Sequence, residues 1–261
     1  MLKTMVKIVP PKVQFKVSLL IILGLLALLL PAVSFSDSFL APVSVLVMLV
    51  GELFFVWAFW PKLQWGTASV HLPVDPKLGL HLSFDDGPTA GLTDRILDLL
   101  KERQVKASFF VLVKKAKQEP ALIKRMVAEG HQVGLHGADH RTPFFRKTPE
   151  LQESLSKAKE ELEKLTGQTV KLYRPSHGWK NLQLLKAAKN CGLQFCFWDF
   201  GVWDTDAPPP DVLIRRLRLS LECGRREAPK TLLLHDGRGD ETTMPAHADV
   251  LKSSLEQVLP A

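Results

Sequence analysis

The stretch from Leu80 to Pro88, LHLSFDDGP, decides the fold of this 261-residue chain. Its first half is mostly apolar and predicts a buried strand, and its second half places two carboxylates, Asp85 and Asp86, before a Gly-Pro turn. Neighbouring residues of a strand face opposite sides, so two adjacent acids reach one site only where the strand ends. A pair of helix-capping aspartates in a loop fits this stretch equally well, so the rest of the chain must decide between the two.

Short apolar runs alternate with amphipathic helical patterns through the rest of the chain. We predict strands at 78–84, 107–113, 132–135, 170–174, 194–198 and 230–234, and helices at 92–104, 119–129, 149–166, 181–190, 209–222 and 245–259. This alternation is typical of an α/β fold with a parallel sheet and helices packed outside it. An open doubly wound sheet and an incomplete barrel both fit the pattern, and both gather functional residues at the carboxyl ends of the strands.

Two histidines follow the third predicted strand, in the segment GLHGADH. His136 and His140 are four positions apart, so they share a face if the loop takes one helical turn, and both imidazoles can then reach one ion. With one aspartate they would form a two-His, one-carboxylate set, which leaves coordination positions open for water and substrate. Such open positions are what a catalytic metal site requires.

Three further predicted strands run into polar side chains. Arg174 ends the fourth strand and can hold a carboxylate ionised and oriented. Trp198 and Trp203 lie at and after the end of the fifth strand and offer apolar faces for a sugar ring, and Asp204 adds an acid. His235 follows the sixth strand with a titratable imidazole. Five polar strand ends in one chain are difficult to explain as solvated surface, so they predict an active site.

Four segments together resemble the motifs of the polysaccharide deacetylase (NodB-like) family, carbohydrate esterase family 4. They are SFDDGP at 83–88, the pair His136 and His140, RPSHG at 174–178 and LLLH at 232–235, in the family's order. The resemblance covers roughly residues 78–240. It implies a distorted (β/α)7-type barrel, the NodB homology fold, where periodicity alone left the choice open.

The same resemblance implies a metal-dependent hydrolase with a role for each matched residue. The metal ligands would be Asp86, His136 and His140, holding a divalent metal, most often Zn²⁺, with other divalent transition metals as alternatives. His177 stands where the family often has Tyr or Phe, whose backbone N–H helps to bind the oxyanion. Substrate contacts are expected from four residues: His177, Trp179, Trp198 and Trp203.

The resemblance also assigns the acid–base groups. Asp85 would be the general base that activates water, and Arg174 the residue that orients this base. His235 would be the general acid that protonates the leaving amine, and Asp204 falls where an acid that tunes this histidine is expected. A metal that polarises the amide carbonyl, with a base and an acid on opposite flanks, would complete an amide hydrolysis.

The first 61 residues differ from the rest of the chain, because they contain only six charged side chains. Two apolar segments, at about 17–35 and 39–60, are each long enough to cross a bilayer as a helix. We therefore predict a membrane anchor at 1–61 made of two transmembrane helices, a connector at 62–77 and a catalytic domain at 78–261. The lysines before the first segment predict that the catalytic domain faces the cytoplasm. A signal peptide is the alternative for the first segment, and the second segment still crosses the membrane in that case. If only one of the two segments spans, the catalytic domain would lie outside the cytoplasm.

The composition narrows the class of partner. The formal net charge is +7, but without a nucleic-acid-binding motif we interpret it as a basic surface near anionic membrane lipids, with no nucleic acid as partner. Three cysteines form no disulfide framework or metal motif.

The sequence thus predicts a membrane-bound, metal-dependent hydrolase that removes an N-acyl group, most often acetyl, from an amino sugar of a polysaccharide or glycan. Two alternatives remain open at this point. One is a deacylase or deformylase of a polyprenyl-phosphate-linked sugar precursor. The other is a catalytically silent carbohydrate-binding protein on the same fold, which the presence of every matched residue disfavours.

Overall fold

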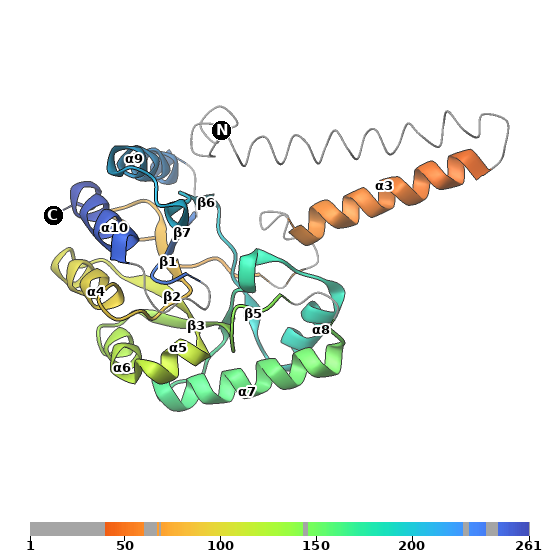
Figure 1. The fold of residues 1–261 in the computed structure, drawn as a ribbon, viewed down its shortest axis with the longest axis horizontal. Coiled ribbons are helices and arrows are strands. Elements are labelled where there is room, and N and C mark those ends of the chain that lie inside the picture. Colours follow the sequence, from red (N-terminus) through yellow and green to blue (C-terminus); the bar gives the residue numbers. More distant parts are fainter. Residues whose placement is uncertain are drawn as a thin grey trace.

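The structure is a computed structural model, and it describes residues 40–59, 67, 69–142, 146–226, 230–238 and 245–260 of the chain. A parallel sheet runs through the body, helices pack around it, and helix α3 (Leu40–Phe59) extends away from it (Figure 1).

The sheet has seven strands in the order β5-β4-β3-β2-β1-β7-β6, and the described strand pairs are parallel. Every residue of β1 and β2 is buried, as expected for central strands that are covered on both faces. Strands β5 and β6 lie at the two edges, so the described strands form an open half-barrel. The strands are β1 (His81–Asp85), β2 (Ala107–Leu112), β3 (Gln132–Gly137), β4 (Leu172–Tyr173), β5 (Gln194–Phe195), β6 (Phe200–Gly201) and β7 (Thr231–His235).

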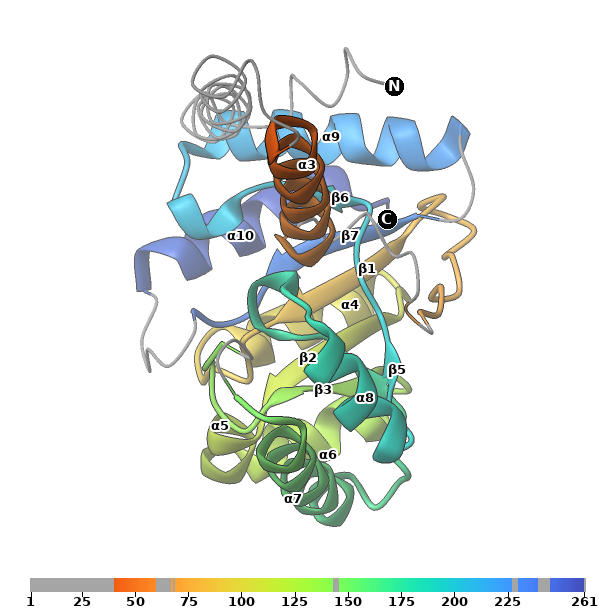
Figure 2. The ribbon, with the colours of Figure 1, turned by 90° about the vertical axis from the view of Figure 1, so that its right-hand side faces the viewer.

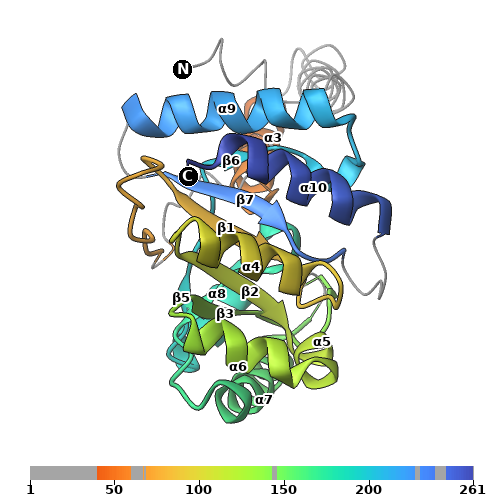
Figure 3. The ribbon, with the colours of Figure 1, turned by 90° about the vertical axis from the view of Figure 1, so that its left-hand side faces the viewer.

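Helices cover the sheet. Figure 3 shows α4, α6 and α10 in front of one face, and Figure 2 shows α8 on the opposite side, with α3 projecting from the body toward the viewer. Two 3-10 turns, η1 (Ser176–Gly178) and η2 (Asp204–Asp206), lie close in the chain to β4 and β6. The helices of the body are α4 (Thr93–Glu102), α5 (Val113–Gln118), α6 (Pro120–Ala128), α7 (Thr148–Thr166), α8 (Leu182–Asn190), α9 (Pro210–Arg226) and α10 (Pro245–Val258).

One large apolar cluster joins the sheet to its covering helices. Helix α4 shows how the sequence builds it, because Ile96, Leu97 and Leu100 recur at helical spacing and are buried. They share the cluster with Phe84 and Phe109, whose rings stack at 5.1 Å between centroids on neighbouring strands. Each fully buried side chain of this size contributes about 1.5–3 kcal/mol to the stability of the fold. The cluster therefore holds the strands in place, and with them the polar residues at the strand ends.

The sequence predicted the order of elements correctly but not all of their lengths. All six predicted strands are present, although β4 and β5 contain only two residues each. Two elements were not predicted, β6 and α5. A two-residue strand is too short to show an alternating pattern, and α5 begins directly where β2 ends, within the predicted strand.

Helix α3 coincides with the second predicted membrane segment, whereas the first, at about 17–35, lies outside the described residues. Leu46 and Leu53 are 61% and 69% exposed, while Trp57 and Ala58 near the end of the helix are buried. There the N–H of Lys180 donates a hydrogen bond to the Ala58 carbonyl, at 3.0 Å. None of the described helices combines the length and the apolar character that a bilayer crossing needs. The predicted transmembrane hairpin is therefore not shown.

The described part of the predicted connector, 67 and 69–77, lies against the body. The N–H of Val70 donates to the Phe195 carbonyl at the edge of the sheet, at 2.8 Å. Leu72 is buried in a small cluster with Phe110 and Cys196. This segment therefore adds to the edge of the sheet beside β5.

Candidate active site

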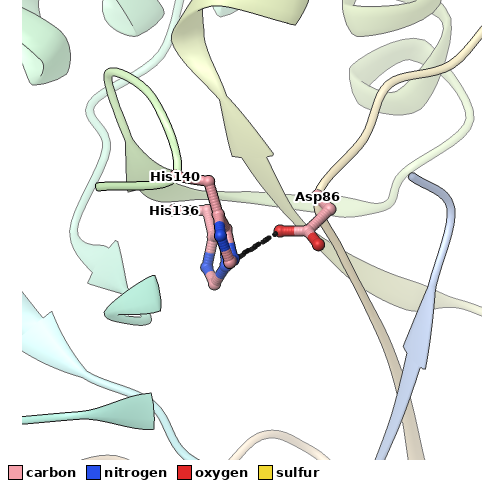
Figure 4. A group of neighbouring side chains, drawn as sticks. All are labelled: Asp86, His136 and His140. Carbon is pink, nitrogen blue, oxygen red and sulfur yellow. Dashed lines mark ion pairs between the residues drawn. The ribbon is translucent and has the colours of Figure 1, made fainter. Parts of the chain in front are cut away.

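Three side chains from the ends of β1 and β3, the two strands on either side of β2, converge on one point (Figure 4). Asp86 Oδ1 lies 3.2 Å from Nε2 of His136 and 3.2 Å from Nε2 of His140. One ligand atom from each residue lies within 4.8 Å of the other two. Four-coordinate zinc with bonds of about 2.0–2.2 Å separates its ligand atoms by about 3.4 Å. The donor atoms and their spacing therefore fit a divalent transition metal.

The backbone brings these residues together in a way that the sequence predicted only in part. Asp86 follows β1 with a φ of 69°, a left-handed conformation that turns its side chain away from the strand direction. His136 and His140 reach one point without the helical turn that their spacing in the sequence would allow. Strand β3 continues to Gly137, whose φ of 124° then bends the chain, and a Cβ there would lie 2.9 Å from the Asp139 carbonyl oxygen.

The predicted base, Asp85, is held by a buried arginine. Nη1 of Arg174 donates to Asp85 Oδ1 at 2.8 Å and to the Ser83 hydroxyl at 2.9 Å. The guanidinium also donates to two main-chain carbonyls after β5, from Nε to Cys196 at 2.9 Å and from Nη2 to Phe197 at 3.3 Å. Arg174 is completely buried, so its position is fixed, and Asp85 Oδ2 lies on the side of His136, 4.0 Å from Nδ1.

The predicted acid, His235, is held by a buried carboxylate. Asp204 Oδ1 lies 2.9 Å from His235 Nδ1, and Asp204 Oδ2 accepts the His235 backbone N–H at 2.7 Å. Because Asp204 occupies Nδ1, the other ring nitrogen, Nε2, is left for the site. Strand register places His235 beside Asp85, since these two residues are partners in the β1–β7 pairing.

The charges of the site oppose the effect of burial. Burial lowers the pKa of His235, but Asp204, and then Asp85 and Asp86, raise it to about 9. Burial raises the pKa of Asp86, but the hydrogen bond and charge of His136, with His235 and His140, bring it well below its usual range. Asp86 is therefore a carboxylate, as a metal ligand must be, and His235 carries a proton at neutral pH.

His177 and Trp179 flank the three predicted ligands. The His177 ring lies edge-on to His140 at 4.3 Å between centroids, and 4.6 Å from the Trp179 ring. His177 has a φ of 60°, so η1 presents this residue in a tight, left-handed turn. Burial, with the charge of His140, lowers the pKa of His177 to about 4. The imidazole is therefore neutral and can donate or accept a hydrogen bond.

The other two predicted substrate residues are placed differently. The Trp198 ring lies 5.5 Å from the Arg174 guanidinium carbon, so it belongs to the base side of the site. Trp203 directly precedes Asp204 with a φ of 56°. Of the four predicted residues, the described ring contacts join only His177 and Trp179, while Trp198 packs against Arg174.

Two parts of the site were missed by sequence reasoning. Ser83 had been noted only as a motif position, yet its hydroxyl accepts from Arg174 and donates to the Leu232 carbonyl at 2.9 Å. Asp236, next to the predicted acid, lies completely buried against the loop that follows β1. Strand alternation could have indicated Ser83, since it points to the same side as Asp85. No local pattern indicates Asp236.

Comparison with known proteins gives one consistent family. The family profile described as Polysaccharide deacetylase matches residues 74–196. The chain is 31% identical over 192 residues to the chitooligosaccharide deacetylase of Sinorhizobium fredii, which covers 70% of this chain and 84% of that protein. It is 37% identical over 126 residues to the peptidoglycan-N-acetylmuramic acid deacetylase PdaA of Bacillus subtilis, which covers 48% of each protein.

A solved structure agrees with these relatives. The crystal structure of the Bc1960 peptidoglycan N-acetylglucosamine deacetylase, in complex with a hydroxamate-type benzamide, superposes with a TM-score of 0.63 at 27% identity. The match covers 79% of this chain and 88% of that chain. The fold and the site together define the class, a parallel half-barrel α/β hydrolase with an Asp-His-His cluster beside its strand ends. The chain belongs to the polysaccharide deacetylase family, carbohydrate esterase family 4, whose members hydrolyse amide bonds of polysaccharides.

Proposed function

We propose that this protein is a metal-dependent deacetylase that removes the acetyl group from an N-acetylated amino sugar of a glycan. One observation carries the proposal. The arginine-held carboxylate, the Asp-His-His cluster and the carboxylate-held histidine lie together at the carboxyl ends of β1, β3 and β7 and in the loops beside them. An amide hydrolysis needs a proton acceptor, a proton donor and a group that stabilises the developing negative charge.

The metal would be held by Asp86, His136 and His140. When bound, a divalent ion supplies Lewis-acid chemistry, which polarises the amide carbonyl and acidifies water. The donor set of one carboxylate and two imidazoles suits Zn²⁺ and also other first-row divalent ions, and we propose Zn²⁺ as the resident ion.

The remaining steps belong to side chains of the chain itself. Asp85 accepts the proton of the attacking water at Oδ2, because Arg174 holds Oδ1. His235 donates a proton from Nε2 to the leaving nitrogen, because Asp204 holds Nδ1. The water oxygen first forms the new C–O bond at the carbonyl carbon, and the C–N bond then breaks as its nitrogen takes the proton from His235, so the products are acetate and the free amine of the sugar.

The relatives guide the choice of substrate. One is named for chitooligosaccharides and one for the N-acetylmuramic acid of peptidoglycan, so we propose an N-acetylated glycan as the first substrate class. His177, Trp179 and Trp198 would contact its sugar rings, since aromatic faces pack well against the apolar faces of sugars. Trp203 would contribute from the side of the acid.

A lipid-linked sugar is the second candidate, and one observation favours it. The exposed apolar helix α3 ends against Lys180, close in the chain to His177. If residues 1–61 bind a membrane, as we propose from their composition, this contact would place the site near the lipid surface. The cytoplasmic face follows from the lysines that precede residue 17, and a reporter fused to the C-terminus tests it. Reporter activity found only outside the cytoplasm would contradict this topology.

The test of the activity uses the purified full chain. Acetate or formate release is measured from a panel of free, polymeric and lipid-linked N-acyl sugars, before and after metal removal and after Zn²⁺ is restored. We expect release that stops on chelation and returns with Zn²⁺. Release that is unaffected by chelation would contradict the metal role. No release from any substrate, with metal bound, would favour the carbohydrate-binding alternative.

A further inference from the structure

A buried carboxylate behind the predicted metal ligand takes no part in the proposed reaction. We infer that Asp236 is a positioning residue, which holds the segment from Asp85 to Gly87 so that the base and the metal ligand both face the site. The inference rests on the proposed metal site and deepens it, because it concerns how this chain keeps Asp86 in place.

The segment needs support, because its backbone is unfavourable. Asp86 has a φ of 69°, in a region that non-glycine residues rarely adopt. Such a conformation persists only where the surrounding structure fixes it. A relaxed Asp86 would swing its carboxylate away from Nε2 of His136 and His140, which now lie 3.2 Å from it.

Asp236 and its neighbour touch this segment at three successive residues. The N–H of Asp236 donates to the Asp85 carbonyl at 3.1 Å. The Asp236 carboxylate packs against the Cα of Gly87 so closely that no Cβ would fit there. Gly237 packs in the same way against the Asp86 carbonyl. The chain after β7 thus covers the main chain on both sides of the strained residue.

Thr93 fixes the Asp236 side chain. Its hydroxyl donates to Asp236 Oδ2 at 2.8 Å and accepts the N–H of Thr89, also at 2.8 Å. Thr93 and Asp236 are completely buried, and the Lys115 ammonium lies close enough to act on the Asp236 charge. This relay joins the start of α4 to the chain after β7, and the Asp85–Gly87 segment lies between them.

A control variant must weaken the fold without touching the loop that bears Asp86, and Asp199 offers one. Thr93 and Asp236 touch the loop that bears the metal ligand, whereas Asp199, another carboxylate that binds the backbone of β7, accepts the N–H of Thr231 at the opposite end of that strand, at 2.9 Å. Removal of Asp199 should therefore weaken the fold without changing the metal site, and it serves as the matched control.

The experiment measures the dissociation constant for Zn²⁺ by chelator competition, together with kcat, KM and the thermal midpoint of the metal-free full-length protein. We expect Asp236→Ala and Thr93→Val each to raise the dissociation constant about tenfold or more, the loss typical for groups that orient metal ligands. We expect kcat to fall with little change in KM. Thr93→Ser keeps the hydroxyl and should restore near wild-type affinity, and Asp199→Ala should leave the affinity unchanged.

Thr93→Val is decisive if Asp236→Ala does not fold, and it changes no charge near the metal. A dissociation constant within about twofold of wild type in folded Thr93→Val would overturn the inference, a difference of less than half a kcal/mol at 1.4 kcal/mol per tenfold. Equal losses of affinity in Thr93→Val and Asp199→Ala would also overturn it, because they would indicate general destabilisation. Failure of the wild-type protein to bind Zn²⁺ would instead overturn the proposed metal site itself.

Discussion

Replacement of Asp204 by Asn removes the charge that holds the predicted acid. Asp204 is buried and contacts both His235 Nδ1 and the His235 backbone N–H, at 2.9 Å and 2.7 Å. A hydrogen bond to a charged partner contributes about 1.5–3 kcal/mol. At about 1.36 kcal/mol per pKa unit, its loss lowers the pKa of His235 by about one to two units. Asn keeps the size of the side chain, so the change is mainly electrostatic.

The assay is the pH dependence of kcat/KM for the Zn²⁺-loaded enzyme. The alkaline limb reports loss of the His235 proton, and we expect it to move to lower pH by about one to two units in Asp204→Asn. Both proteins carry the same metal, so the effect of the metal on His235 cancels in the comparison. An alkaline limb at the same pH in both proteins would refute the role of Asp204.

The stability of the metal-free protein gives an independent check with a defined sign. The folded-state pKa of His235, about 9, lies above the ordinary value of 6.5. The protonated pair therefore stabilises the fold fully below pH 6.5, and this stabilisation is lost as the pH rises through about 9. We expect urea unfolding to show a difference between wild type and Asp204→Asn at about pH 6 that disappears near pH 10. A difference of equal size at both pH values would point to packing rather than charge.

Three further substitutions test the other groups. Asp85→Asn should keep Zn²⁺ bound while kcat falls about 10²–10⁴-fold, and unchanged turnover would contradict the base role. Arg174→Met leaves the Asp85 carboxylate buried without its partner, so urea unfolding should show a loss of about 3–5 kcal/mol; a loss below about 1 kcal/mol would mean that the pair is solvated. His136→Ala removes one of the three predicted ligands, so metal analysis after gel filtration should find no retained Zn²⁺, and full retention would place the metal elsewhere.

The predicted site residues that the structure brings together share one property, which is that their position follows from strand ends. Asp85, His136 and His235 each lie at the carboxyl end of a parallel strand. Neighbouring parallel strands end at the same edge of the sheet, so the apolar pattern alone brought these side chains together. The charge partners Arg174 and Asp204 were also indicated, by the motifs in which they occur.

Other features depend on contacts that no local pattern contains. Thr93 and Asp236 are 143 positions apart, yet their side chains share a hydrogen bond. The two histidines reach one point through the bend at Gly137 rather than through a helical turn, because a glycine with a φ of 124° bends the chain within one residue. The Thr93–Asp236 hydrogen bond and the bend at Gly137 both depend on how loops pack in the folded protein. Loop packing leaves no repeating pattern of apolar residues in the sequence.

The pairing of β1 with β7 has a consequence for how the protein becomes active. These two strands are the first and the last in the chain, yet they are neighbours in the sheet. The Ser83 hydroxyl of β1 donates a hydrogen bond to the Leu232 carbonyl of β7, which is 149 positions further along the chain. Contacts of such long sequence separation form late in folding, because a long loop must close first. A nascent chain can assemble the five strands from β1 to β5 while β7 is still inside the ribosome. That intermediate lacks both His235 and Asp236, so it has neither the proton donor nor the residue that holds Asp86 toward His136 and His140. The metal site and the acid are therefore completed by the same late step, the docking of β7.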